Sequence, residues 1–174
     1  TLAGVKAASL FRIDDIVKGP LPKSFLPVRE ALDNKDLHLR VMRARKGTQH
    51  VFLYRQRQLI DILQRPEIRK FLYTYGYSYP SSVAVPQTYP ISWCAEDAFL
   101  ERLLSRLERR FQNKAEFPHE IGIFLGYPLE DTIGFIEQRG KNYLCAGCWK
   151  VYGDVERCMK HFEQYQKMRK SYLD

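Results

Sequence analysis

A histidine and two acidic residues in one apolar, glycine-containing run of the chain could together perform acid–base chemistry. His119 and Glu120 are adjacent, and Asp131 follows shortly after them. An imidazole titrates near neutral pH, and a carboxylate that orients it completes a general base. The run is not a zinc-protease motif, because Ile123 stands where a second histidine is needed. His119, Glu120 and Asp131 are therefore candidate catalytic residues, and a packed helix start is the structural alternative.

Glycine and aromatic residues around this run are typical of the wall of a binding pocket. Glycine lets the backbone approach a ligand, although tight packing between segments has the same requirement. A later segment, 149–152, alternates aromatic and polar side chains and could form a second wall or belong to the core. The candidate ligand-contacting residues are Gly122, Gly126, Tyr127, Trp149, Lys150 and Tyr152. No phosphate-binding or nucleophile-elbow motif occurs, so the sequence names neither a cofactor nor a reaction.

Three cysteines and a histidine near the end of the chain have the spacing of a structural zinc site. The pattern C-x2-C-x9-C-x2-H is formed by Cys145, Cys148, Cys158 and His161. Structural zinc sites often combine two thiolates from a turn with two ligands from a helix. However, Cys158 lies on the apolar stripe of a predicted helix, and a chain of this size needs no metal to stabilise its core.

Positive charge is concentrated in residues 40–70, which carry seven of the eight net positive charges of the chain. Such a region could bind nucleic acid or an acidic protein, and a solvated surface is the alternative. The residues proposed to bind such a partner are Arg40, Arg43, Arg45, Arg55 and Arg57.

Hydrophobic periodicity predicts a small, mainly antiparallel sheet of three or four strands with several helices packed on it. We expect strands at 37–42 and 49–54, joined as a hairpin, and further strand character at 142–152. Helices are predicted at 27–34, 56–64, 66–75, 96–111, 129–139 and 154–172. In the last helix Val155, Cys158, Met159, Phe162 and Tyr165 are expected to face inward, and Asp154 to cap it. Residues 1–13 are predicted to form a short helix or a docked arm, and 77–93 a tyrosine-rich loop that could cover a pocket.

Length and composition favour one α+β domain spanning residues 1–174. The chain is 45% apolar and 13% aromatic, which is typical of a folded globular protein. No apolar run is long enough for a membrane helix, and no secretory signal is visible. We therefore expect a cytoplasmic protein whose four cysteines are reduced. The sequence does not predict whether the protein is an enzyme, nor its oligomeric state.

Three segments of the chain read TLAGVKAASLF, LYRQRQL and FPHEIGIFLGYPLEDTIGFIEQRGKNYLCAGCWKVYGD. They resemble segments of a bacterial family of unknown function, found mostly in anaerobic Gram-positive bacteria. Its members share PHEIG, LGYP and WKVY segments, and no activity is established for them. The resemblance implies that the positions shared with the family determine either the fold or the site. They are His119, Glu120, Gly122, Gly126, Tyr127, Pro128, Asp131, Gly134, Trp149, Lys150 and Tyr152. Members commonly lack cysteine at the positions of Cys148 and Cys158, which argues against zinc. They also continue upstream of Thr1, often with a cysteine that could complete the site.

These observations lead to three hypotheses. The first is a small-ligand or cofactor-binding domain whose pocket is formed by the HEIG–LGYP and WKVY segments, with His119 as polar anchor oriented by Glu120 or Asp131. The second is a nucleic-acid or acidic-partner binding module that uses the basic region, and the third is a structural zinc domain.

Overall fold

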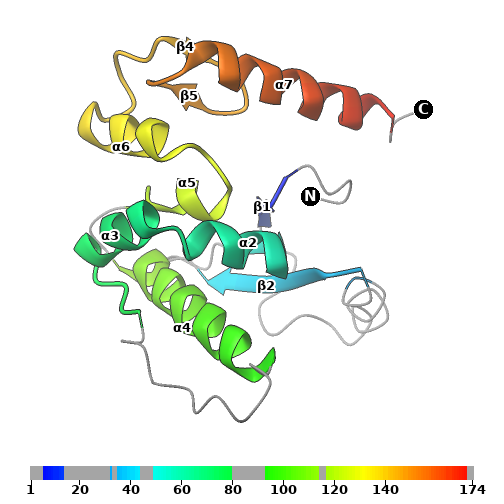
Figure 1. Ribbon diagram of the computed structural model, residues 1–174, viewed down its shortest axis with the longest axis vertical. Coiled ribbons are helices and arrows are strands. Elements are labelled where there is room, and N and C mark those ends of the chain that lie inside the picture. Colours follow the sequence, from blue (N-terminus) through cyan, green and yellow to red (C-terminus); the bar gives the residue numbers. More distant parts are fainter. Residues whose placement is uncertain are drawn as a thin grey trace.

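The computed structural model describes residues 6–13, 32, 35–43, 49–79, 93–113 and 117–171. They form an α+β fold, which confirms the predicted fold class. The elements are β1 (Ala8–Ile13), β2 (Leu37–Arg43), β3 (Gln49–Arg55), α2 (Gln56–Leu63), α3 (Pro66–Thr74), α4 (Trp93–Gln112), α5 (Ile121–Phe124), α6 (Leu129–Glu137), β4 (Cys145–Ala146), β5 (Lys150–Val151) and α7 (Val155–Lys170). In Figure 1 the lower layer holds the sheet with α4 below β2 and with α2 and α3 above it; α5 lies higher, and α6, β4, β5 and α7 form the upper layer.

The larger sheet is antiparallel, with the strand order β1-β3-β2. The predicted hairpin is confirmed, because β2 pairs with β3 and Val41 lies opposite Val51. The prediction of a helix or docked arm for residues 1–13 is wrong for Ala8–Ile13, which form β1. Ala8 lies opposite Tyr54 and Ile13 opposite Gln49, so the edge of β3 supplies the hydrogen bonds that β1 needs.

Helix α4 carries the main apolar stripe of the lower layer. Leu100, Leu103, Leu104 and Leu107 recur at helical spacing and are all buried. They share one core with residues of the sheet and of α2, α3 and α5. The helix includes the whole predicted range 96–111. The paired helices predicted on either side of Pro66 are also confirmed, and this proline begins α3.

A smaller core lies in the upper layer and joins β5 to α7. It consists of Trp149, Val151, Cys158 and Phe162. Tyr127 packs against both this core and the larger one, so the turn between α5 and α6 connects the two layers. Asp154 caps α7, because its Oδ1 accepts a hydrogen bond from the backbone N–H of Arg157, as predicted.

Two sequence predictions differ from the structure, and two others lie mostly outside the described residues. Met159 is 45% exposed, so its inward placement was wrong; it follows Cys158 directly and is rotated away from the buried stripe. The strand character expected over 142–152 is limited to the short hairpin of β4 and β5. The predicted helix at 27–34, apart from residue 32, and most of the predicted loop at 77–93 lie outside the described residues. Among the described helices, none combines the length and the apolar character needed to cross a bilayer.

Candidate functional site

A cavity of about 390 Å³ lies where the two layers meet. Its wall comes from β1, from the segment around α5, from α6 and from the β4–β5 hairpin. The lining residues are Leu10, Phe117, His119, Ile121, Gly122, Leu125, Tyr127, Asp131, Thr132, Phe135, Ala146, Gly147, Cys148, Trp149 and Lys150. Four of the six candidate ligand-contacting residues, Gly122, Tyr127, Trp149 and Lys150, are therefore in one wall. Most of the remaining wall is apolar.

The imidazole of His119 lies between two phenylalanine rings at this cavity. Its ring centroid is 5.4 Å from that of Phe117 and 5.0 Å from that of Phe135. The side chain is half-buried. The backbone carbonyl of His119 accepts a hydrogen bond from Gly122, which fixes the turn that precedes α5. The two apolar rings thus hold the imidazole at the wall of the cavity.

Lys150 places a positive charge on the same wall. Its Nζ donates a hydrogen bond of 2.6 Å to the carbonyl oxygen of Gly140. The ammonium also lies 4.8 Å from the ring centre of Tyr143 and 5.9 Å from that of Phe135. A lysine ammonium has three donors, so a position remains for an anionic ligand group. Phe135 contacts two of the polar side chains of the cavity wall, His119 and Lys150.

Glu120 does not orient His119, and this part of the first hypothesis is wrong. Its carboxylate is 1% exposed and accepts hydrogen bonds from Arg110 Nε at 2.8 Å and from the Tyr77 hydroxyl at 3.2 Å. The hydrogen bond to Glu120 raises the pKa of the Arg110 guanidinium. Burial, with the adjacent Glu120 charge, raises the pKa of Tyr77. Glu120 therefore ties α5 to α4 within the larger core.

Asp131 is likewise fully engaged in the fold. Its Oδ1 accepts from the backbone N–H groups of Tyr152 and Gly153 at 2.7 and 2.9 Å. Its Oδ2 accepts from Trp149 Nε1 at 2.7 Å and from Cys158 Sγ at 3.2 Å. One carboxylate that is 2% exposed thus holds α6 to β5 and to the start of α7. These four hydrogen bonds make Asp131 a structural residue that also borders the cavity.

The Cys158 thiol gives this arrangement a pH dependence. Burial, helped by the hydrogen bond to Asp131, raises its pKa from 9.0 to about 12. The protonated thiol therefore stabilises the fold fully below about pH 9, and this contribution is lost as the pH rises towards 12. Above pH 9 we expect the free energy of unfolding to fall by about 1.4 kcal/mol per pH unit from this group. Urea unfolding at pH 8 and 10.5 should show a smaller fall in Cys158→Ser, whose hydroxyl does not titrate there. Equal falls in both proteins would contradict the assignment.

Two of the candidate glycines are required by the fold. A Cβ at Gly122 would come within 2.7 Å of Thr132 Oγ1, so glycine allows α5 and α6 to approach closely. Gly126 has φ of +79°, which favours glycine in the turn after α5. Gly126 borders a neighbouring cleft, and Tyr152 lies outside the walls of both hollows. Glycine use here thus reflects packing as well as access.

The neighbouring cleft has a volume of about 380 Å³ and is far more polar. It opens between α2–α3 and α6–α7, and Tyr127 and Trp149 separate it from the apolar cavity. These two rings stack with centroids 4.8 Å apart. The charged and titratable residues of the cleft are Arg65, Glu67, Glu130, Arg157 and His161.

The predicted zinc ligands do not converge. Cys158 is buried against Asp131, Cys148 is exposed at the apolar cavity, and His161 borders the polar cleft. Among the described residues, no three His, Cys, Asp or Glu side chains are grouped so that they could hold a metal ion. Cys145 is half-buried in β4, so the four residues share a spacing in the sequence but do not form one site in the structure.

The basic region is only partly available to a partner. Arg40 forms ion pairs with Glu101 at 2.6 Å and Glu108 at 3.0 Å, so its charge is neutralised by α4. Arg55 donates to the backbone carbonyl of Lys35, and Arg57 is exposed. The side chain of Arg43 and all of Arg45 lie outside the described residues.

Sequence reasoning missed Leu10, Phe117 and Phe135 as cavity residues. Phe117 and Phe135 are the two ends of the run that contains His119, and their aromatic character was the available signal. Leu10 could not be inferred from its surroundings, because it reaches the cavity only through the pairing of β1 with β3. Of the tyrosines that could have formed a lid or packed over the core, the described ones belong to the core: Tyr77 lies in the larger core, and Tyr75 and Tyr79 pack against it.

Comparison with known proteins gives one match. No curated protein and no solved structure matches the chain. The family described as "Protein of unknown function (DUF3793)" matches residues 1–174. The chain therefore belongs, over its whole length, to this family of unknown function.

Proposed function

We propose that this protein binds a small, flat, largely apolar molecule that carries an acidic group. The observation that supports the proposal is the cavity of about 390 Å³, whose apolar wall holds an imidazole and an ammonium. Ligand pockets typically have volumes of 300–1,000 Å³ and combine apolar walls with a few polar groups.

The chemistry of the wall defines the ligand class. Phe117, Phe135 and Trp149 offer aromatic faces and edges, which favour a planar apolar ligand. Lys150 has donors available for a carboxylate, sulfonate or phosphate, and a charge-assisted hydrogen bond is strong where water is excluded. His119 provides a second polar contact. A neutral aliphatic ligand would offer no acceptor to the remaining donors of Lys150 and no hydrogen bond to His119, so it is disfavoured.

Fluorescence of 1-anilinonaphthalene-8-sulfonate tests the proposal directly, since this probe is flat, aromatic and anionic. We expect saturable binding, and we expect Lys150→Met to weaken it by about tenfold through loss of the charge-assisted hydrogen bond. Lys160→Met is the matched control, because Lys160 is exposed on α7 and pairs only with Glu156 among the described contacts. It should bind like the unmodified protein.

Alkylation of Cys148 gives a second readout, because this exposed thiol borders the cavity. Saturating probe should slow iodoacetamide labelling of Cys148, followed by peptide mass spectrometry. Displacement of the probe by aromatic carboxylates would then identify better ligands. The proposal fails if binding is equally weakened in both lysine variants, or if Cys148 is labelled at the same rate with and without probe.

A further inference from the structure

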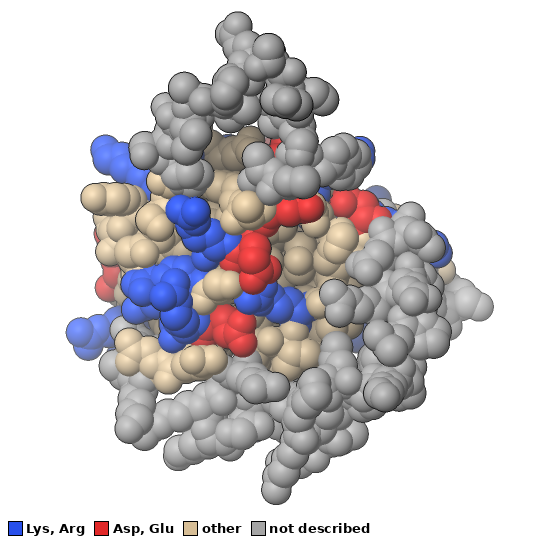
Figure 2. All heavy atoms as spheres, turned by 90° about the horizontal axis from the view of Figure 1, so that it is seen from below, with Lys and Arg blue, Asp and Glu red and all other residues tan. Residues whose placement is uncertain are grey.

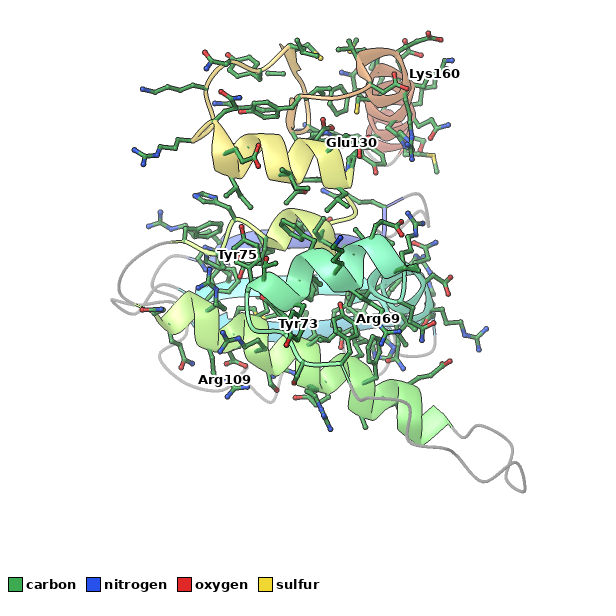
Figure 3. All side chains as sticks on the ribbon, turned by 60° about the vertical axis from the view of Figure 1, so that its left-hand side comes forward. Arg69, Tyr73, Tyr75, Arg109, Glu130 and Lys160 are labelled. Carbon is green, nitrogen blue, oxygen red and sulfur yellow. The ribbon has the colours of Figure 1, made fainter. Side chains whose placement is uncertain are left out.

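Two basic stripes lie on neighbouring helices on the opposite side of α3 from the polar cleft. The stripe on α3 consists of Arg69 and Lys70 together with the aromatic residue Tyr73. The stripe on α4 consists of Arg102, Arg106 and Arg109, which recur at helical spacing. We call these six residues the α3–α4 surface. All are exposed except Arg106, which is half-buried. Figure 3 shows Arg69 and Tyr73 together on α3, with Arg109 on α4 beneath them.

Contacts between the two helices hold the stripes side by side. Arg106 Nη2 donates a hydrogen bond of 2.9 Å to the carbonyl oxygen of Tyr75, at the end of α3. Gly76 leaves room for this guanidinium, since a Cβ there would lie 2.6 Å from it. The guanidinium of Arg69 lies 4.8 Å from the ring centre of Tyr79, which in turn contacts Phe99 of α4. The positions of both stripes are therefore fixed by the fold.

Acidic residues of α4 are segregated from this surface. Glu101 and Glu108 lie on the other flank of α4, where Arg40 of β2 pairs with both. Glu67, the acidic residue of α3, borders the polar cleft. Figure 2 shows the face seen from below, where blue side chains gather to one side and red ones lie beside them. The α3–α4 surface therefore carries five positive charges and no carboxylate of its own.

We propose that the α3–α4 surface binds single-stranded nucleic acid. Guanidinium and ammonium groups along two helices can follow a phosphate backbone. Tyr73, on α3 with Arg69, is 74% exposed, so its ring offers a stacking platform for an unpaired base beside these charges (Figure 3). In a duplex the paired bases are stacked on one another and cannot stack on this ring, and an acidic peptide of glutamates has no base to stack on it. The exposed aromatic ring thus favours a single strand over both.

Fluorescence anisotropy with a fluorescein-labelled oligothymidylate of 20 nucleotides tests this proposal. The pair Arg102→Glu and Arg109→Glu should weaken binding at least tenfold. Lys160→Glu with Lys167→Glu on α7 makes the same change in net charge at exposed positions and should weaken it less than twofold. Tyr73→Ala, which leaves the charge unchanged, should weaken binding about tenfold through lost stacking. Affinity should fall with salt, with a log–log slope of about −0.7 for each phosphate contacted.

Four results would overturn the proposal: no binding at 50 mM salt, equal losses in the two double variants, full binding by Tyr73→Ala, or tighter binding of a duplex or of polyglutamate. Circular dichroism of each variant separates lost binding from lost folding. The probe of the apolar cavity should still bind to Arg102→Glu with Arg109→Glu, so the two proposals succeed or fail separately.

Discussion

Asp131→Ala is expected to lower the free energy of unfolding by about 4 kcal/mol. The carboxylate accepts four hydrogen bonds, and its removal leaves the donors of Trp149, Tyr152, Gly153 and Cys158 without this acceptor. The Trp149 and Cys158 donors are buried, and each buried donor left unsatisfied costs roughly 1–3 kcal/mol. Water can reach the half-buried turn at Tyr152 and Gly153, which limits the total.

Two variants make the test sharper. Asp131→Asn keeps one oxygen for the backbone N–H groups but turns an NH₂ group towards Trp149 and Cys158, so we expect an intermediate loss. Asp154→Ala removes only the cap of α7 and should cost about 1 kcal/mol. Urea unfolding followed by tryptophan fluorescence measures all three. A loss below about 1 kcal/mol in Asp131→Ala would show that the carboxylate does not hold the two elements together.

The elements that were predicted well are those whose signal is local. Helix α4 follows from its leucine spacing, and α3 begins at Pro66, as its sequence indicates. Strand β1 was missed because its stability comes from pairing with β3, far along the chain. A strand at a sheet edge needs little alternation of its own when the partner supplies the hydrogen bonds. The sequence of Ala8–Ile13 therefore did not distinguish it from an arm.

The cavity illustrates the same limit at the level of side chains. Glycine and aromatic content singled out both segments that line it, but the roles of adjacent residues could not be separated. His119 and Glu120 lie in one tight turn, where successive side chains point about 100–120° apart. The two side chains therefore leave the turn in different directions: His119 borders the cavity and Glu120 enters the core beside α4.

Long-range ion pairing also decided which part of the basic region is available. Arg40 belongs to the charge-rich segment 40–70, but its two partners lie on α4 and are invisible to a count along the chain. Conversely, Arg106 of α4 lies outside that segment and meets the end of α3 only in the folded protein, where it donates to the carbonyl oxygen of Tyr75. The net charge of a segment thus predicted attraction to anions but not the surface that would exert it.

Glu120→Ala is expected to lower the free energy of unfolding by about 3 kcal/mol, because it removes one partner of a buried ion pair. The expected loss is near the lower end of the range measured for broken buried ion pairs, because the Arg110 side chain is 26% exposed and can turn towards water. The hydroxyl of Tyr77 cannot, because Tyr77 is fully buried and its bond to Glu120 crosses the core. The loss of stability therefore has two sources, the Tyr77 hydroxyl that has lost its acceptor and the lost ion pair with Arg110.

A double-mutant cycle separates these two contributions. Tyr77→Phe alone should cost about 1 kcal/mol, because it leaves Glu120 with Arg110. In Glu120→Ala, however, the same change removes a donor that has no acceptor and should cost nothing or restore stability. The coupling energy is then about 1 kcal/mol or more, measured by urea unfolding. Strict additivity would mean that the two side chains do not interact. His119→Ala, one residue away, should cost less than Glu120→Ala, because its half-buried ring lies at the cavity wall and not in the core.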